Sequence, residues 1–204
     1  RNFDRFVEVR GLSEKIVKAD KASWQINFNV SGSNLKQIYS QINQQQQIVS
    51  AFLAHHGFKE NEYAKQAISV IDNYANAYGN NTTRLPQYTA NTGINITTSN
   101  VDLVTSAVGQ TNLLVESGVI LTFNTVNYSY NELNKLKASM LDEALANARV
   151  SAAQFALNSH SHLGKIKTAT QGLFTITAPD SNMGDAASID KKVRVVTTVQ
   201  FFLD

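Results

Sequence analysis

Apolar and polar residues alternate most regularly between residues 21 and 31. The apolar members share one parity: Ala22, Trp24, Ile26, Phe28 and Val30. A period of two predicts a strand with one buried face and one polar face. A shorter run with β-branched and aromatic residues at 3–10, ending at Gly11, predicts a first strand.

Helical spacing follows this strand. From Leu35 to Leu53 the apolar residues recur at spacings of three, four and seven, which predicts a helix. Ser33 is its expected N-cap, and Gly57 lies just beyond its last turn. The four glutamines at 44–47 fall inside this helix, where we expect them on a solvated face.

A hairpin and a second helix are predicted next. Extended segments at 62–78 and 87–98, separated by the polar stretch 79–81 and Pro86, indicate two antiparallel strands. Ser99 and Asp102 have capping-box spacing and open a helix that stops at Gly118. Residues 119–130 return to strand character.

The longest predicted helix covers residues 132–161 and follows a capping-box pattern, Ser129-x-x-Glu132. Its apolar stripe contains a row of small residues that would let a neighbouring sheet or helix approach closely: Ala144, Ala148, Ala152 and Ala156. Gly164 is the expected end of the helix. Strands at 165–178 and 192–203 follow, separated by a polar loop at 179–190.

After the first strand the order of elements is therefore β-α-β-β-α-β, then α-β-β. This order predicts an α+β fold with a ferredoxin-like βαββαβ core and an antiparallel sheet. The long helix and the C-terminal β-hairpin would extend that sheet or form a second lobe. The 204 residues, 43% of them hydrophobic, suit a single domain 1–204, with sub-lobes 12–130 and 131–204.

Composition restricts the function. A net charge of +2 gives a weak field for phosphate backbones, so we expect no nucleic acid partner. Cysteine is absent, which excludes thiolate chemistry and disulfides. No window approaches the roughly 18 consecutive apolar residues of a membrane helix. Because the first residue is Arg1, we expect a missing N-terminal segment: a removed signal peptide, a membrane anchor, or a trimmed end.

The histidines form two close pairs, His55 with His56 and His160 with His162. Imidazole is a common ligand for zinc and similar metals, so metal binding is one interpretation. Both pairs fall at predicted helix ends, where a histidine also interacts favourably with the helix dipole. Neighbours on a helix point about 100° apart, which hinders chelation by His55 and His56. We favour the helix-end interpretation and assign no metal site.

The carboxylates match no catalytic pattern, and neither do the serines and glycines, since hydrolase and phosphate-loop motifs are missing. The candidate acids are Asp72, Asp102, Glu116, Asp142 and Glu143. We expect the last two, with Lys137 and Arg149, to form a solvated or ion-paired helix side. Asn95-Ile96-Thr97 and Asn127-Tyr128-Ser129 match the short glycosylation pattern, which also arises by chance. No catalytic residue and no cofactor is therefore assigned.

Several stretches together resemble the SIMPL-domain family of bacterial envelope proteins. They are FVEVRGLSE at 6–14, VKADKASW at 17–24, Tyr88-x-Ala90, 143–152, Leu163-Gly164-Lys165-Ile166 and 193–201. Where many relatives have proline after the aromatic residue of the second strand, this chain has Trp24-Gln25. The resemblance covers nearly the whole chain.

This resemblance implies a periplasmic protein, which an N-terminal anchor could tether to the inner membrane, and assembly into homo-oligomers. It implies no reaction. Our leading hypothesis is a non-catalytic envelope protein that acts through self-assembly or partner binding. The alternative is a periplasmic small-molecule or metal-binding module with a cleft between the long helix and the sheet. An enzyme would need a site built from residues distant in sequence.

Overall fold

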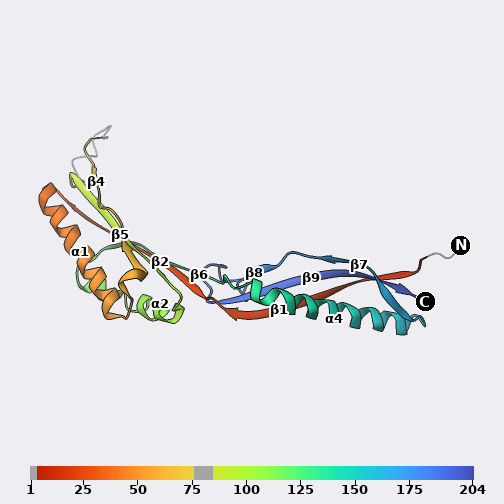
Figure 1. Ribbon diagram of the computed structural model, residues 1–204. Helices are drawn as coiled ribbons and strands as arrows, with labels where there is room; N and C mark the ends of the chain where they lie inside the picture. The colour runs from red at the N-terminus through yellow and green to blue at the C-terminus, as the bar shows by residue number, and fades with distance from the viewer. Residues whose placement is uncertain (1–3, 76–84) are drawn as a thin grey trace. The chain divides into compact units, whose positions relative to one another are not determined.

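The computed structural model describes residues 4–75 and 85–204. The chain divides into two compact units, each with its own antiparallel sheet. We name residues 20–129 the central unit, and residues 1–19 with 130–204 the terminal unit. Figure 1 shows the elements of both units.

The central unit is a sheet with helices on one face (Figure 1). Its elements are β2 (Lys21–Gly32), α1 (Leu35–His55), η1 (Glu60–Glu62), β3 (Tyr63–Lys65), β4 (Ser69–Asp72), β5 (Tyr88–Thr98), α2 (Val101–Val108), α3 (Asn112–Glu116) and β6 (Leu121–Ser129). The strand order is β3-β5-β2-β6, with β4 also paired to β5, and every pair is antiparallel. The alternation in β2 is confirmed, because Trp24, Ile26 and Phe28 are fully buried beneath the helices.

The extended segment predicted at 62–78 is interrupted within the described residues, and its part from residue 76 onward, with the expected loop at 79–81, lies outside them. Between β3 and β4 the carbonyl of Gln66 leaves the strand ladder. It accepts hydrogen bonds from Nε2 of Gln46 at 3.0 Å and from Oγ1 of Thr92 at 2.9 Å. Gln46 is 6% exposed, so the solvated face expected for 44–47 is wrong at this residue.

Two helices of the central unit end at the glycines that the sequence predicts. Gly57 and Gly118 have φ of +96° and +89°, and the amide of the next residue bonds back into the helix, from Phe58 to Leu53 and from Val119 to Leu114. The N-caps differ from the prediction. Asn34 and Asn100, rather than Ser33 and Ser99, accept the first-turn amides of Gln37 and Leu103. The asparagine side chain stands one residue closer to the helix in each case.

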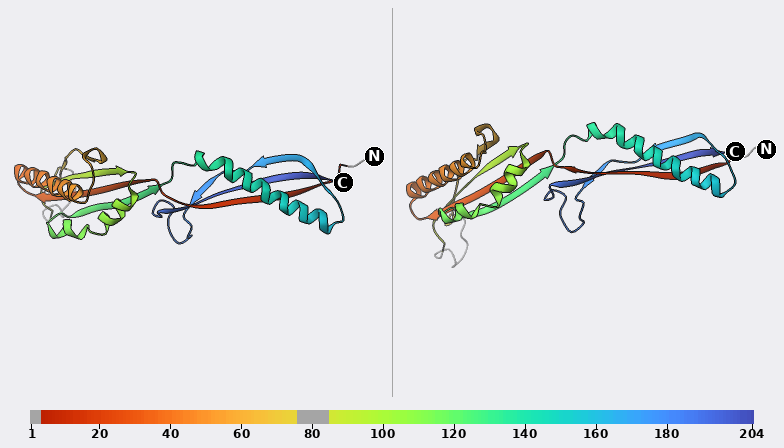
Figure 2. Two further views of the ribbon diagram at one scale, coloured as in Figure 1. Left: turned by 60° about the horizontal axis from the view of Figure 1, so that its bottom comes forward. Right: turned by 90° about the horizontal axis from the view of Figure 1, so that it is seen from below.

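The terminal unit is a second sheet covered on one face by a single helix (Figure 2). Its elements are β1 (Phe6–Lys18), α4 (Asn134–Asn158), β7 (Leu163–Gln171), β8 (Thr175–Thr177) and β9 (Asp190–Leu203). Strand β9 lies between β1 and β7, and β8 also pairs with β9. The first strand predicted to end at Gly11 continues to Lys18. Residues 12–18, which the predicted sub-lobe 12–130 includes, pair here with β9.

Helix α4 is shorter than the predicted 132–161. Its N-cap is Leu133, which makes no side-chain capping bond, so the capping box at Ser129-x-x-Glu132 is wrong. Glu132 instead forms an ion pair with Lys135, 2.8 Å apart. Gly164 does not end the helix but lies in β7. The described residues contain no helix both long and apolar enough to cross a membrane.

The small-residue row of α4 lies against β1, as the sequence predicts. All four of its alanines are buried, and Gly11 is buried opposite Ala144 and Ala148. A Cβ on Gly11 would overlap the carbonyl oxygen of Ala144 and lie 2.7 Å from the amide nitrogen of Ala148. Backbone therefore meets backbone here, and no space remains for the ligand cleft expected between the long helix and the sheet. That expectation is wrong at this position.

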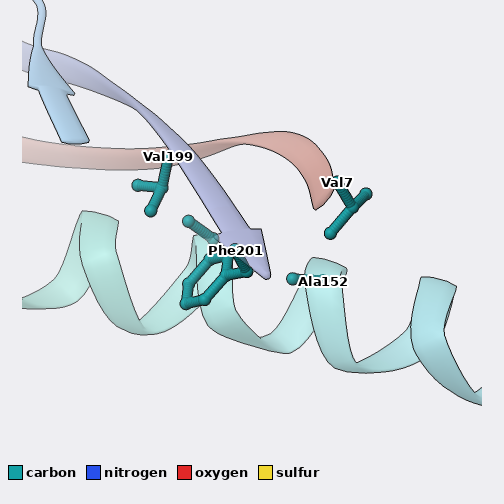
Figure 3. Packing of buried hydrophobic residues seen from close by; sticks show 5 residues of the cluster. Val7, Ala152, Val199 and Phe201 are labelled. Carbon is teal, nitrogen blue, oxygen red and sulfur yellow. The ribbon is translucent and has the colours of Figure 1, made fainter. Parts of the chain in front are cut away.

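Apolar side chains fill the remaining interface between α4 and the sheet. Figure 3 shows Val7 of β1 together with Val199 and Phe201 of β9, packed against Ala152. Two hydroxyls beneath the helix are buried without a hydrogen-bond partner, Oγ of Ser13 and Oγ1 of Thr197. Burial without a partner costs about 1–3 kcal/mol for each such group.

The α+β class is confirmed by the mixed helices and antiparallel sheets. The ferredoxin-like topology of the core stays a prediction. The long helix and the C-terminal strands form their own sheet with β1, which is the second of the two arrangements that the sequence left open.

Candidate interaction surface

His56 has a structural role at the end of α1. Its Nδ1 lies 2.8 Å from the carbonyl oxygen of Phe52, and its Nε2 lies 2.7 Å from Oε1 of Gln110. The predicted helix-end role is confirmed for His56, because Nδ1 donates to a carbonyl of the last turn. Both ring nitrogens are engaged, so a metal would have to break one of these bonds.

His160 also ends a helix, through its backbone. Its φ of 56° is left-handed, and the amide of Ser161 donates to the carbonyl of Ala156 at 2.9 Å. His160 therefore occupies the position that glycine takes at the ends of α1 and α3. His162 pairs its backbone with Asp204. In residues 4–75 and 85–204, no three histidine or carboxylate side chains gather as metal ligands.

The candidate carboxylates lie on separate elements or on a solvated surface. Asp72 is in β4, Asp102 in α2 and Glu116 in α3, while Asp142 and Glu143 are exposed on α4. The expected ion-pairing partners on α4 lie over aromatic rings instead. Nζ of Lys137 is 5.8 Å from the ring centroid of Phe174, and the guanidinium carbon of Arg149 is 5.5 Å from that of Phe201.

Glu62 is a carboxylate with a perturbed pKa that the sequence analysis missed. The hydroxyl of Thr98 and the amide of Lys59 both donate to it, and these hydrogen bonds lower the pKa of Glu62 below its ordinary value. No sequence pattern marks Glu62, because lysine at position 59 lacks the side-chain acceptor of a capping box. The bonds tie η1 to β5, which is a structural role.

The face of the terminal sheet opposite α4 combines exposed apolar and charged side chains. We name it the terminal open face. It consists of alternating residues of β1, namely Phe6, Glu8, Arg10, Leu12, Glu14 and Ile16, and their partners on β9, namely Phe202, Gln200, Thr198, Val196, Arg194 and Lys192. Phe6, Leu12 and Ile16 are 44%, 38% and 56% exposed. At about 3.3 Å per residue, the 13 residues of β1 extend this face over about 40 Å.

One ion pair and one hydrogen bond link β1 to β9 across this face. Nε of Arg194 lies 3.2 Å from Oε1 of Glu14, and Nε2 of Gln200 donates to Oε1 of Glu8 at 3.2 Å. Nζ of Lys167 on β7 sits 3.9 Å from the ring centroid of Phe6. Apolar and charged side chains thus alternate along this face, an arrangement suited to contact with another surface of mixed charge.

The apolar pattern does not predict this face, because by local rules the first strand ends at Gly11. Gly11 and Ser13 point toward α4, at positions where a strand with one buried face would have apolar residues. The alternation of apolar and polar residues is therefore not recognisable beyond Val9. The outward residues Leu12, Glu14 and Ile16 were the remaining signal.

Two comparisons with known proteins bear on these findings. A family model described as "SIMPL: Protein of unknown function (DUF541)" matches residues 7–201, nearly the whole chain. No curated protein matches it.

Proposed function

Because this chain belongs to the SIMPL family, described as proteins of unknown function, we propose its function from its surfaces: self-assembly through the terminal open face, without catalysis. The observation that carries this proposal is the row of exposed apolar residues on the face of the terminal sheet opposite α4. Single exposed apolar residues are ordinary. Phe6, Leu12 and Ile16, however, lie on one face of one strand, beside Val196 and Phe202.

The charges support a second copy of the chain as the partner. A closed dimer uses the same patch on both subunits, so the patch must be self-complementary. A two-fold axis through Leu12 would set Glu14 of one copy opposite Arg10 of the other, while the two Leu12 side chains meet on the axis. The face then provides an apolar centre with opposite charges on both sides of it.

Light scattering over a range of concentrations tests the proposal. Leu12→Lys brings two lysines together on the proposed axis, in the apolar centre, and we expect it to shift the protein toward monomer. Val150→Lys is the matched control, because Val150 is 69% exposed on α4 in the same unit. A wild-type chain that stays monomeric at the highest concentration, or a Val150→Lys variant that dissociates equally, would contradict self-assembly by this face.

A charge swap tests the register. Glu14→Arg places two arginines opposite each other and should weaken assembly. Adding Arg10→Glu restores opposite charges across the proposed axis and should recover it. If the double variant assembles no better than Glu14→Arg, the two-fold arrangement is wrong even where self-assembly holds.

We further propose a periplasmic location, with membrane contact only through an N-terminal segment outside this sequence. Family resemblance supports this location. Fractionation of cells that express the native gene tests it, and recovery of the protein with the cytosolic fraction would refute it.

We also propose that the protein catalyses no reaction. The alternative is a periplasmic small-molecule or metal-binding module. Its metal-binding form predicts stabilisation by divalent metals in a thermal-shift assay.

A further inference from the structure

We propose that the open face of the central sheet binds a neutral carbohydrate. This face consists of the polar, outward-pointing residues of β2 and of the residues on β5 and β6 that pair with them. Three cross-strand rows cover its middle: Asn127–Ser23–Thr97, Thr125–Gln25–Asn95 and Phe123–Asn27–Gly93. Apart from Phe123 and Gly93, every side chain in these rows ends in an amide or a hydroxyl. Each such group both donates and accepts hydrogen bonds, as sugar hydroxyls do.

The face is hollowed where the first two rows lie. A hollow of about 340 Å³ is lined by side chains of Ser23, Gln25, Asn95, Thr97, Thr125 and Asn127, with Phe123 at one side. This volume is at the lower end of the range for small-molecule sites. Phe123 is 45% exposed although it is large and apolar. The face of an aromatic ring is electron-rich and attracts the weakly positive C–H groups of a sugar ring.

Hydrogen bonds within the face hold its amides in place. Nε2 of Gln66 donates to Oδ1 of Asn95 at 3.0 Å and to Oδ1 of Asn27 at 3.4 Å, and Gln25 donates to the same Asn27 oxygen at 3.4 Å. Gly93 allows this network, because a Cβ there would lie 3.1 Å from the side-chain carbonyl carbon of Gln66. With both oxygens occupied, the Nδ2 groups of Asn27 and Asn95 turn away from Gln66 and can donate to a ligand.

On the part of the chain that the structure describes, the hollow lacks the charged side chains that surfaces for binding nucleic acids have. The lining of the hollow, all of it within the described residues, contains no charged side chain. Single-stranded nucleic acids need a basic groove and several stacking aromatics, whereas this hollow offers one phenylalanine. The terminal open face, on the same chain, carries Glu8, Arg10, Glu14 and Arg194. A neutral, hydroxyl-rich ligand fits the amide face better than a polyanion.

A second protein copy also fits the hollow poorly. Stable homodimer interfaces have cores that are about 65% apolar. Phe123 is the single apolar side chain among the three rows. Desolvating so many amides and hydroxyls favours a partner that satisfies each of them, which a carbohydrate can do. The proposal does not depend on self-assembly, which uses the other unit.

The test is a titration of the ¹⁵N-labelled chain with three neutral probes, cellohexaose, maltohexaose and chitohexaose. A single-stranded DNA oligonucleotide serves as the polyanion. We expect saturable shifts of the Asn and Gln side-chain amides of this face with at least one probe, with a Kd of about 1 mM or tighter. The same signals should not respond to DNA.

Matched variants locate the site. Phe123→Ala removes the stacking ring, and we expect binding to weaken about tenfold, whereas Phe155→Ala should leave it unchanged. Phe155 is a suitable control because it is 49% exposed and lies on α4 in the terminal unit. Thr125→Val keeps the side-chain shape of a lining residue without its hydroxyl and should also weaken binding. Emission from buried Trp24 checks that each variant is folded.

Three outcomes would overturn the proposal: no response to any neutral probe at concentrations well above ~1 mM, equal binding by Phe123→Ala and wild type, or shifts confined to the terminal unit. A response to DNA alone would assign the face to nucleic acid.

Discussion

Gly11→Ala is the sharpest test of how the terminal unit is built. The change adds one methyl group at the closest approach of β1 and α4. That methyl would overlap the carbonyl oxygen of Ala144 and lie 2.7 Å from the amide nitrogen of Ala148. Both atoms belong to the helix backbone, so no side-chain rotation can relieve the overlap.

The expected loss follows from this geometry. Ordinary contacts between heavy atoms lie at about 3.5–4.0 Å, so relieving the overlap with the Ala144 carbonyl moves the helix away by more than about 1.5 Å, which weakens the packing along its alanine row. Overpacking a core costs about 1–3 kcal/mol, and we expect the upper end because backbone must move. Alanine recovers about 0.5–1 kcal/mol of the entropic cost of glycine in a strand. The free energy of unfolding of the terminal unit should therefore fall by about 2 kcal/mol.

Hydrogen exchange of the α4 amides, measured in native buffer, reports the opening of this unit. Gly184→Ala is the matched control, because a Cβ there meets nothing within 4 Å. It should leave protection unchanged or raise it slightly. If the α4 amides exchange as slowly in the Gly11→Ala variant as in the Gly184→Ala variant, then β1 and α4 do not approach each other as closely as described.

Three further changes test individual groups. Thr197→Val removes a buried hydroxyl without a partner and should stabilise the terminal unit by about 1 kcal/mol, whereas Thr198→Val on the opposite face should change little; exchange of α4 amides compares them. His160→Gly relieves a left-handed backbone and should slow exchange at the end of α4, by up to about 1 kcal/mol; faster exchange would show that the imidazole matters more than the backbone. Hydrogen bonds lower the pKa of Glu62 in the folded chain from 4.5, so its stabilisation is present above the unfolded pKa and is lost as pH falls through the folded pKa. Glu62→Gln should therefore flatten the acid dependence of urea unfolding followed by Trp24 emission, and a curve as steep as that of wild type would refute this assignment.

Local signals in the sequence were enough to predict the elements with regular burial. The alternation in β2 and the alanine row of α4 each reflect a buried face, and both are confirmed. Gly57 and Gly118 mark helix ends because a left-handed residue is needed there. At the end of α4 the same conformation is held by His160, so Gly164 misled the prediction.

The features that the sequence did not predict depend on contacts between residues far apart in the chain. Gly11 ends a strand by local rules, yet here it continues one, because α4 leaves no room for a side chain. Gln46 reads as a solvated helix position, but the carbonyl of Gln66 and the hydroxyl of Thr92 give it buried partners. The candidate surfaces depend on pairings across the chain, such as β1 with β9, which no window of sequence contains.

The pairing of β1 with β9 also sets an order of events during synthesis. Glu8 and Gln200, whose side chains meet, are 192 residues apart in the chain. The central unit, by contrast, is complete once Ser129 has left the ribosome. The edge of the first strand that pairs with β9 therefore has no partner until β9 has also been synthesised. A strand that stays unpaired in this way can associate with the edge strands of other chains. The positive charges of Lys15 and Lys18 on this strand oppose such association.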